Sequence, residues 1–382
     1  MPLVGLLAAI SAQAVWAADP IASNNGLYPE PDEYEGRFLI ANLDYPSDPP
    51  SHRWPLGGGV GELTTENAGL YALALKAYLE PTLRTLIEDS QSWDPVAAGW
   101  YDLVWSGEGE PGKDGKTDPN SGRDAIMNTY TGQIMPAETF FPPYTPSVDV
   151  QNHAVIYYDG VAASMLDEIW KDIYRPDMRA IDFPDGSVVV KAEAVTPTVE
   201  EWPVLKDASS WNVFRPTMAD QKAGTNPLEP KVLTVHPFQM AIKVKDPIAS
   251  PTTGWVFMAL VYDTESSGAT PWDRFVPVGV MWGNDAGFAR YPNGRPEGTP
   301  LVETWLNPDR PDFTNSTLGW GGRLAGPMDV ATRHNVVTPS GKRFQGADHL
   351  RASSCMSCHG ASEFPFSANL YPSPNKSFPP DG

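Results

Sequence analysis

Five residues near the C-terminus have the types and the spacing that could do chemistry. They form the run Cys355-Met356-Ser357-Cys358-His359, which is the C-x-x-C-H pattern of covalent c-type haem attachment and contains the chain's two cysteines. Positions i and i+3 share one face of a helix, so both thiols can reach the two vinyl groups of one porphyrin. His359 follows directly and would give the iron its proximal nitrogen. The pattern therefore predicts one haem c per chain, held by Cys355, Cys358 and His359.

Two other kinds of site also use closely spaced cysteines. A redox C-x-x-C pair needs a thioredoxin-like βαβ setting, which this proline-broken region lacks. A zinc site needs a second pair of ligands at finger-like spacing, and the sequence has no such pair. Haem attachment is therefore the preferred interpretation of the two cysteines.

A sixth iron ligand would have to come from upstream of the motif, unless that iron position is open. The short segment after His359 contains neither Met nor His. Met240 is the preferred candidate, because it shares the predicted apolar strand face of Phe238, Ile242 and Val244. The other upstream candidates are His153, His236, His334, His349, Met258, Met281 and Met328.

The first seventeen residues predict export of the protein. The segment 1–17 is uncharged and largely apolar, and Val15 and Ala17 fit the −3/−1 pattern of a signal peptidase site before Ala18. No later stretch has the roughly eighteen uninterrupted apolar residues that are needed to span a bilayer. Haem c is attached outside the cytoplasm, so the leader and the haem motif agree. We expect a periplasmic or otherwise exported protein without a membrane span.

The charge balance bears on the partners of the protein. Lys and Arg total 27 against 47 Asp and Glu, which gives a formal net charge of −20. A chain this acidic repels phosphate backbones and anionic lipid surfaces. We therefore expect no nucleic-acid partner, and a redox partner protein with a basic surface.

The order of the predicted elements indicates an α+β fold with two regions. Residues 18–149 would form a helical, Pro/Gly-rich N-terminal extension around a helix over 64–89, where leucines recur at helical spacing. Residues 150–382 would form a β-rich haem domain that ends in a haem-attachment helix. Short connections between successive strands favour an antiparallel sheet. The strands are expected over 153–158, 187–194, 231–235, 238–245, 254–262 and 274–282, with a helix over 161–173.

Several short motifs follow one another in the haem domain. They are FPDGSVVVK over 183–191, VKD over 244–246, GWVF over 254–257 and the C-x-x-C-H pattern. In this order, across residues 150–362, they resemble a family of β-sheet cytochromes of the P-four-sixty type. That family includes hydroxylamine oxidases with a haem–lysine crosslink and the related β-type cytochromes c-prime, which bind nitric oxide.

The resemblance implies roles for two residues. Lys191 matches the lysine that crosslinks to the porphyrin in the oxidase members, and His359 would be the proximal ligand of an otherwise open iron. The chain also departs from the compact members, because a much longer segment separates Lys191 from Cys355. It is more similar to a branch of larger exported monohaem proteins that share PVGVMWGND over 277–285 and GWGGRL over 319–324.

The alternation of side chains along the strand of Lys191 defines two faces. One face is wholly apolar and would face the core, with Val188, Val190, Ala192 and Ala194. Lys191 shares the other face with Ser187, Val189 and Glu193. This second face is either a solvated sheet surface or a wall of the haem pocket, and the pattern leaves both interpretations open.

Two functions fit the predicted haem. The first is electron transfer through one low-spin haem with both axial positions filled, and we prefer it because it needs the fewest further residues. The second is an oxidoreductase or sensor with a five-coordinate haem that acts on hydroxylamine or nitric oxide. In that case Lys191 would modify the macrocycle. A structural or scavenging haem protein is a third, weaker alternative.

Overall fold

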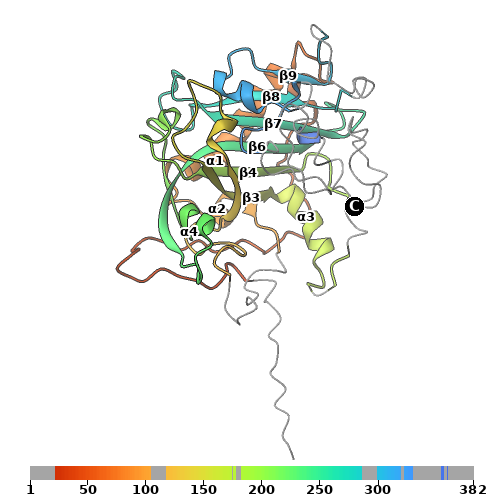
Figure 1. The fold of residues 1–382 in the computed structure, drawn as a ribbon. Helices are drawn as coiled ribbons and strands as arrows, with labels where there is room; N and C mark the ends of the chain where they lie inside the picture. The colour runs from red at the N-terminus through yellow and green to blue at the C-terminus, as the bar shows by residue number, and fades with distance from the viewer. Residues whose placement is uncertain are drawn as a thin grey trace, which may run out of the picture.

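The computed structural model describes residues 22–104, 118–173, 175–177, 182–285, 299–319, 322–329, 354–356 and 359. The predicted signal peptide over 1–17 and Cys358 lie outside these residues. A nine-stranded sheet runs through the described part of the chain (Figure 1). Its strand pairs are antiparallel, which confirms the expected α+β class with an antiparallel sheet.

The elements have the following bounds. The strands are β1 (Trp100–Tyr101), β2 (Tyr130–Met135), β3 (Val150–Asp159), β4 (Val188–Val195), β5 (Trp211–Arg215), β6 (Lys231–Lys245), β7 (Trp255–Tyr262), β8 (Phe275–Met281) and β9 (Thr304–Leu306). The α-helices are α1 (Ala68–Glu88), α2 (Pro95–Ala98), α3 (Gly160–Ile169) and α4 (Met218–Ala223). Short 3-10 helices are η1 (Leu56–Gly59), η2 (Ala137–Thr139), η4 (Pro203–Leu205) and η6 (Asp312–Thr317).

The strand order of the sheet is β1-β3-β4-β6-β7-β8-β9, while β2 also pairs with β3 and β5 with β6. Figure 1 shows β3, β4, β6, β7 and β8 side by side across the centre of the molecule. Strands β1 and β2 precede residue 150 and pair with β3. The sheet therefore includes part of the region that was expected to be an extension.

Strand β6 joins two stretches that the sequence predicts as separate strands. The two expected strands, over 231–235 and 238–245, leave out Pro237, which has no backbone N–H to donate. In the structure, the first part of β6 pairs with β5, and the rest pairs with β4 and β7. The register of the β4 pairing shifts where Pro237 lies opposite Ala194. This local irregularity accommodates the missing donor, so the strand continues past the proline.

The register of the central strands gives the sheet two different faces. Lys191 of β4 lies opposite Ile156 of β3 and Ala241 of β6. The next residue along β4, Ala192, lies opposite Met240 of β6. Because successive side chains point to opposite sides, these two rows belong to opposite faces. Ala192 and Met240 are fully buried, so their face is the core face that the alternation along this strand predicts.

Helix α1 supplies much of the core that this face contacts. Its buried side chains recur at helical spacing and belong to the same hydrophobic cluster as Ala192 and Met240. They include Tyr71, Leu75, Leu79, Leu83 and Leu86. The helix also packs against β8. Among the described residues, the helices are all too short or too polar to cross a membrane.

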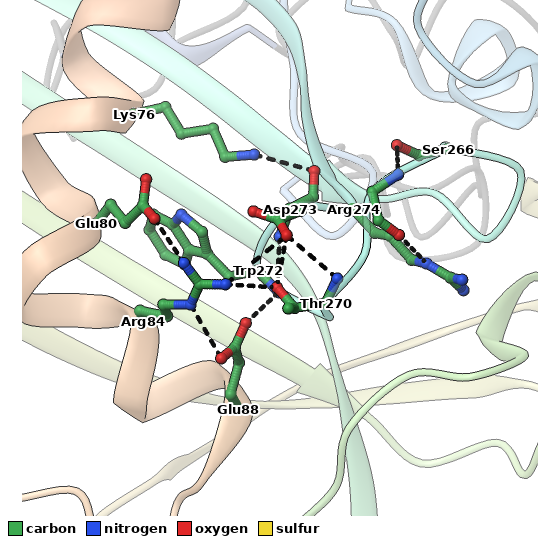
Figure 2. Close-up of polar contacts among 10 residues, drawn as sticks. Lys76, Glu80, Arg84, Glu88, Ser266, Thr270, Trp272, Asp273 and Arg274 are labelled. Carbon is green, nitrogen blue, oxygen red and sulfur yellow. Dashed lines mark hydrogen bonds and ion pairs between the residues drawn. The ribbon is translucent and has the colours of Figure 1, made fainter.

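Polar contacts fix α1 to the loop between β7 and β8 (Figure 2). Arg84 pairs with Glu80 and Glu88 along the helix, at 2.6 and 3.0 Å. It also reaches Asp273 of the loop at 3.7 Å, and Lys76 Nζ donates to the Asp273 carbonyl at 3.1 Å. Because these side chains are partly exposed, solvent screens the ion pairs and each contributes little to stability. The ion pairs therefore orient α1, while burial of its leucines in the core supplies most of the stability that keeps the helix packed on the sheet.

Candidate functional site

The haem motif is anchored by two segments that precede it in the chain. Cys355 and Met356 are helical, and the side chain of Met356 is fully buried. The backbone N–H of Cys355 donates to the carbonyl of Leu324 at 3.2 Å. The hydroxyl of Ser354 donates to Oδ1 of Asn284 at 3.2 Å. Asn284 and Leu324 belong to the segments 277–285 and 319–324, which the sequence singled out without assigning them a structural task.

A cavity of about 330 Å³ lies between the motif and the sheet face that carries Lys191. This volume falls within the range of natural ligand pockets. The charged, aromatic and sulfur-containing groups in its lining include Cys355, His359, Lys191, Lys243, Phe257 and Asp329. Much of the remaining wall is apolar, with Ile156, Val189, Ala241 and Ala325. An apolar wall with a few convergent polar groups is typical of a cofactor or ligand site.

His359 is held in this cavity by a ring contact and a polar contact. Its imidazole stacks on Phe257, with ring centroids 5.4 Å apart and an interplanar angle of 24°. Its Nδ1 lies 3.2 Å from Nζ of Lys243. Burial, together with the positive charge of Lys243, lowers the pKa of His359 to about 3. The imidazole is therefore neutral near pH 7, which is the form that binds iron.

Lys191 is paired with two carboxylates. Its Nζ lies 2.8 Å from Oε1 of Glu193 and 2.8 Å from Oδ1 of Asp329. Burial by itself would lower the pKa of Lys191, but the charges of Asp329 and Glu193 outweigh it and raise that pKa above its usual range. Lys191 is therefore an ammonium ion in this arrangement, and its parity on β4 places it on the cavity side of the sheet.

An amide side chain joins the two carboxylates as well. Gln239 Nε2 donates to Oε2 of Glu193 at 2.5 Å and to Oδ2 of Asp329 at 2.6 Å. Its Oε1 accepts from the backbone N–H of Met328 at 2.7 Å, which fixes the orientation of the amide. Asn152 Nδ2 also donates to Glu193. We refer to Lys191, Glu193, Gln239 and Asp329 as the carboxyl cluster.

The sequence signalled only part of the carboxyl cluster. The alternation along β4 put Glu193 on the same face as Lys191, but it gave Glu193 no role. Asp329 lies 138 residues from Lys191, and no local pattern could connect them. Gln239 lies next to the sixth-ligand candidate Met240 on β6. The alternation of side chains along this strand, which puts neighbouring residues on opposite faces, was the only feature of the sequence that could have placed Gln239 on the cavity side.

Met240 is not brought into the cavity. It lies opposite Ala192 and Leu260, in a row on the core face, and it is fully buried there. Its neighbour Ala241 lines the cavity on the other face. The apolar strand face that suggested Met240 as an iron ligand instead packs into the core, because apolar strand faces are buried there whether or not a cofactor is near.

The other upstream candidates are distributed differently. Met258 borders the cavity, but it lies opposite Ile242 in the register, so its side chain belongs to the same buried core face as Met240. His153 is fully buried, and its two ring nitrogens have no hydrogen-bond partner among the described residues. Nδ1 of His236 contacts the carbonyl of Ser209 at 2.9 Å. Met281 and Met328 are buried, whereas His334 and His349 lie outside the described residues.

No protein-family model matches this chain, and no curated protein matches it by sequence. The chemistry of the cavity therefore rests on the residues that line it. Among the described residues, no three His, Cys, Asp or Glu side chains gather into a group that could hold a metal ion. A haem iron does not need such a group, because the porphyrin provides the equatorial nitrogens and the protein provides the axial ligands. A thiol, a neutral imidazole and an apolar wall around one cavity fit a haem.

Proposed function

We propose that this protein is an exported c-type haem protein that carries one haem c. Cys355 and Cys358 would form the two thioether links, and His359 would be the proximal iron ligand. The observation that carries the proposal is that Cys355 and His359 line one mostly apolar cavity of about 330 Å³. When bound, the haem supplies a redox-active iron, while the chain orients it and sets its electrostatic surroundings.

Electron transfer is the role that we favour. Lys191 is an ammonium ion that contacts Glu193 and Asp329 at 2.8 Å each. A protonated amine has no lone pair with which to attack a porphyrin carbon, so these ion pairs disfavour the crosslink of the oxidase type. Nδ1 of His359 contacts Lys243, so the iron would bind through Nε2 in this arrangement. The net charge of −20 would steer the protein to a basic redox partner.

A second role has one observation in its favour. Lys191 and Asp329 line the cavity with side chains that are 29% and 27% exposed. Charged groups at this exposure keep water in a cavity, and they could hydrogen-bond a small polar ligand near the iron. This arrangement would suit a sensor or an oxidoreductase that binds hydroxylamine or nitric oxide.

The optical spectrum of the purified, exported protein tests both the haem and its role. In the wild type, we expect a covalently bound haem that stays attached when the protein is denatured. The control Ser357→Ala should keep this haem, whereas Cys355→Ala and Cys358→Ala should lose it. Sharp low-spin α and β bands in the reduced protein would support electron transfer. A broad high-spin spectrum that shifts with nitric oxide or carbon monoxide would support the second role. Absence of covalent haem in the wild type would overturn the proposal.

A peptide map tests the fate of Lys191 separately. Under the electron-transfer role, we expect a tryptic peptide cleaved after an unmodified Lys191. A Lys191 peptide that retains the haem mass would contradict this expectation and support the crosslinked oxidase type.

A further inference from the structure

The carboxyl cluster contains two acidic groups and one cation in direct contact. Lys191 Nζ touches one oxygen of each carboxylate, and Gln239 Nε2 touches the other oxygen of each. The same two donors therefore bridge both acids, so a proton added to either acid changes the hydrogen bonds of both. Groups coupled in this way titrate as a pair.

The charge balance of the cluster favours the uptake of one proton. With both acids ionised and Lys191 protonated, the cluster has one negative charge in excess, although Glu193 is fully buried. Gln239 and Asn152 donate hydrogen bonds but cannot supply a compensating charge. One proton shared by Glu193 and Asp329 would make the cluster neutral, and a neutral group is easier to bury.

The two acids differ in their access to solvent. The side chain of Glu193 is fully buried, whereas that of Asp329 is 27% exposed and lines the cavity. Asp329 can therefore exchange a proton with water, while Glu193 holds it away from water. The pKa of Glu193 is raised to about 7 by burial and by the charge of Asp329, with Lys191 acting in the opposite direction.

We propose that Glu193 and Asp329 form a proton-exchange site that is coupled to the redox state of the haem. This inference rests on the proposed function. If a haem is bound here, its reduction by the redox partner would add one negative charge to the cavity, and the acid pair would take one proton from water to balance it. On oxidation, the electron would return to a partner and the acid pair would release the proton to water. Among the described residues, the other charged or titratable groups on this cavity are Lys191, Lys243, His359 and the Cys355 thiol.

The proton site can be measured without reference to the haem. In infrared spectra, the carboxylic-acid C=O band of the wild type should appear as the pH falls through about 7. Glu193→Gln should weaken this band, to which the buried Asp159 also contributes, whereas the exposed-site control Glu168→Gln should keep the full wild-type band. Should Glu193→Gln fail to fold, the partly exposed Asp329→Asn provides the second variant, and it should shift or weaken the band. A band that is unchanged in both variants would overturn the site.

The redox coupling requires the haem-loaded protein. We expect its midpoint potential to fall with rising pH around neutrality, by up to about 59 mV for each tenfold drop in proton concentration. The slope should flatten in Glu193→Gln or Asp329→Asn and persist in Glu168→Gln. A loaded wild type whose potential does not depend on pH would overturn the coupling alone. A protein without covalent haem would overturn the proposed function, and the infrared band would then report only a buried proton.

Discussion

Lys191 and Asp329 lie 138 residues apart in the chain, and their side chains form an ion pair of 2.8 Å at the wall of the cavity. The pair connects β4 to the segment that follows η6. It also keeps Lys191 protonated, because the charges of Asp329 and Glu193 raise the pKa of the lysine above its usual range.

Removal of the Lys191 charge should destabilise the protein in a pH-dependent way. Lys191→Met leaves two carboxylates in contact with no cation between them. Breaking a buried ion pair costs about 3 to 5 kcal/mol, and the partial exposure of Lys191 reduces the expected loss to about 2 kcal/mol at pH 8. At pH 5 the loss should be smaller, because Glu193 then carries a proton. Urea unfolding at the two pH values measures the difference.

A surface pair serves as the control for this variant. Lys222 pairs with Asp149, and both side chains are partly exposed. Lys222→Met should therefore cost less than about 1 kcal/mol, at either pH. A Lys191→Met variant that behaves like Lys222→Met would show that the carboxyl cluster is not a charged network in solution.

A buried carboxyl group should make the stability of the protein fall as pH rises. Burial raises the pKa of Asp159 to about 7, although the backbone N–H groups of Ala162 and Val188 lower it in part. The folded state therefore holds a proton that the unfolded state has lost between about pH 4 and pH 7, and stability decreases across that window. Asp159→Asn should flatten this dependence and be more stable than the wild type at pH 8 by at least about 1 kcal/mol.

The geometry makes Asp159→Asn a conservative change. The backbone N–H groups of Ala162 and Val188 both donate to Oδ1, and an amide oxygen can accept the same two bonds. Unfolding free energies measured from pH 4 to pH 8 provide the check. An Asn variant that runs parallel to the wild type throughout would show that Asp159 is ionised at all of these pH values.

His153 should cost the protein stability, most of all in acid. It is fully buried, and neither ring nitrogen has a hydrogen-bond partner among the described residues. Burial and the charge of Arg215 lower the pKa of His153 to about 3. The unfolded state therefore binds a proton that the folded state excludes between about pH 6.5 and pH 3, so stability falls as pH drops through this range.

Replacement of this imidazole by an apolar side chain removes both the unpaired buried ring nitrogens and the loss of stability in acid. We expect His153→Leu to be neutral or to stabilise the protein by about 1 kcal/mol at pH 7, and to reduce the loss in acid. His236→Leu is the matched control, because Nδ1 of His236 contacts a carbonyl at 2.9 Å and its removal should destabilise. Thermal unfolding at pH 4.5 and 7 tests the pair. A His153→Leu variant that loses more stability than His236→Leu would contradict the expectation.

The anchor of the haem motif should be separable from the stability of the sheet. Asn284→Ala removes the acceptor of the Ser354 hydroxyl, which costs about 1 kcal/mol locally. We expect the global unfolding transition to change little and limited proteolysis after residue 350 to become faster. Asn315→Ala is the control, because it removes a contact to Arg310 at an exposed site. Equal proteolysis in the two variants would show that this hydrogen bond does not hold the motif.

Local patterns in the sequence predicted the fold class and much of the strand layout. Period-2 alternation identified the two faces of β4, because side-chain direction along a strand is a local property. The expected strand over 187–194 corresponds to β4 (Val188–Val195), and that over 254–262 to β7 (Trp255–Tyr262). The expectation of two separate strands over 231–235 and 238–245 was wrong, because strand continuity at Pro237 depends on an irregular pairing with a neighbouring strand. Strands β1 and β9 are too short for a periodic signal, and β2 has no alternation of buried and exposed side chains.

The sequence by itself determined the C-x-x-C-H pattern, the antiparallel sheet and the face of β4 on which Lys191 lies. Each of these follows from residue types at fixed short spacing. Only the tertiary structure decided that Lys191 contacts Asp329, that Gln239 bridges two acids, and that Met240 faces the core. These contacts join residues whose distance in space is set by strand register and by long loops, and no short-range pattern encodes that distance. The charge state of Lys191 depends on those contacts, so its chemistry could be read only from the folded chain.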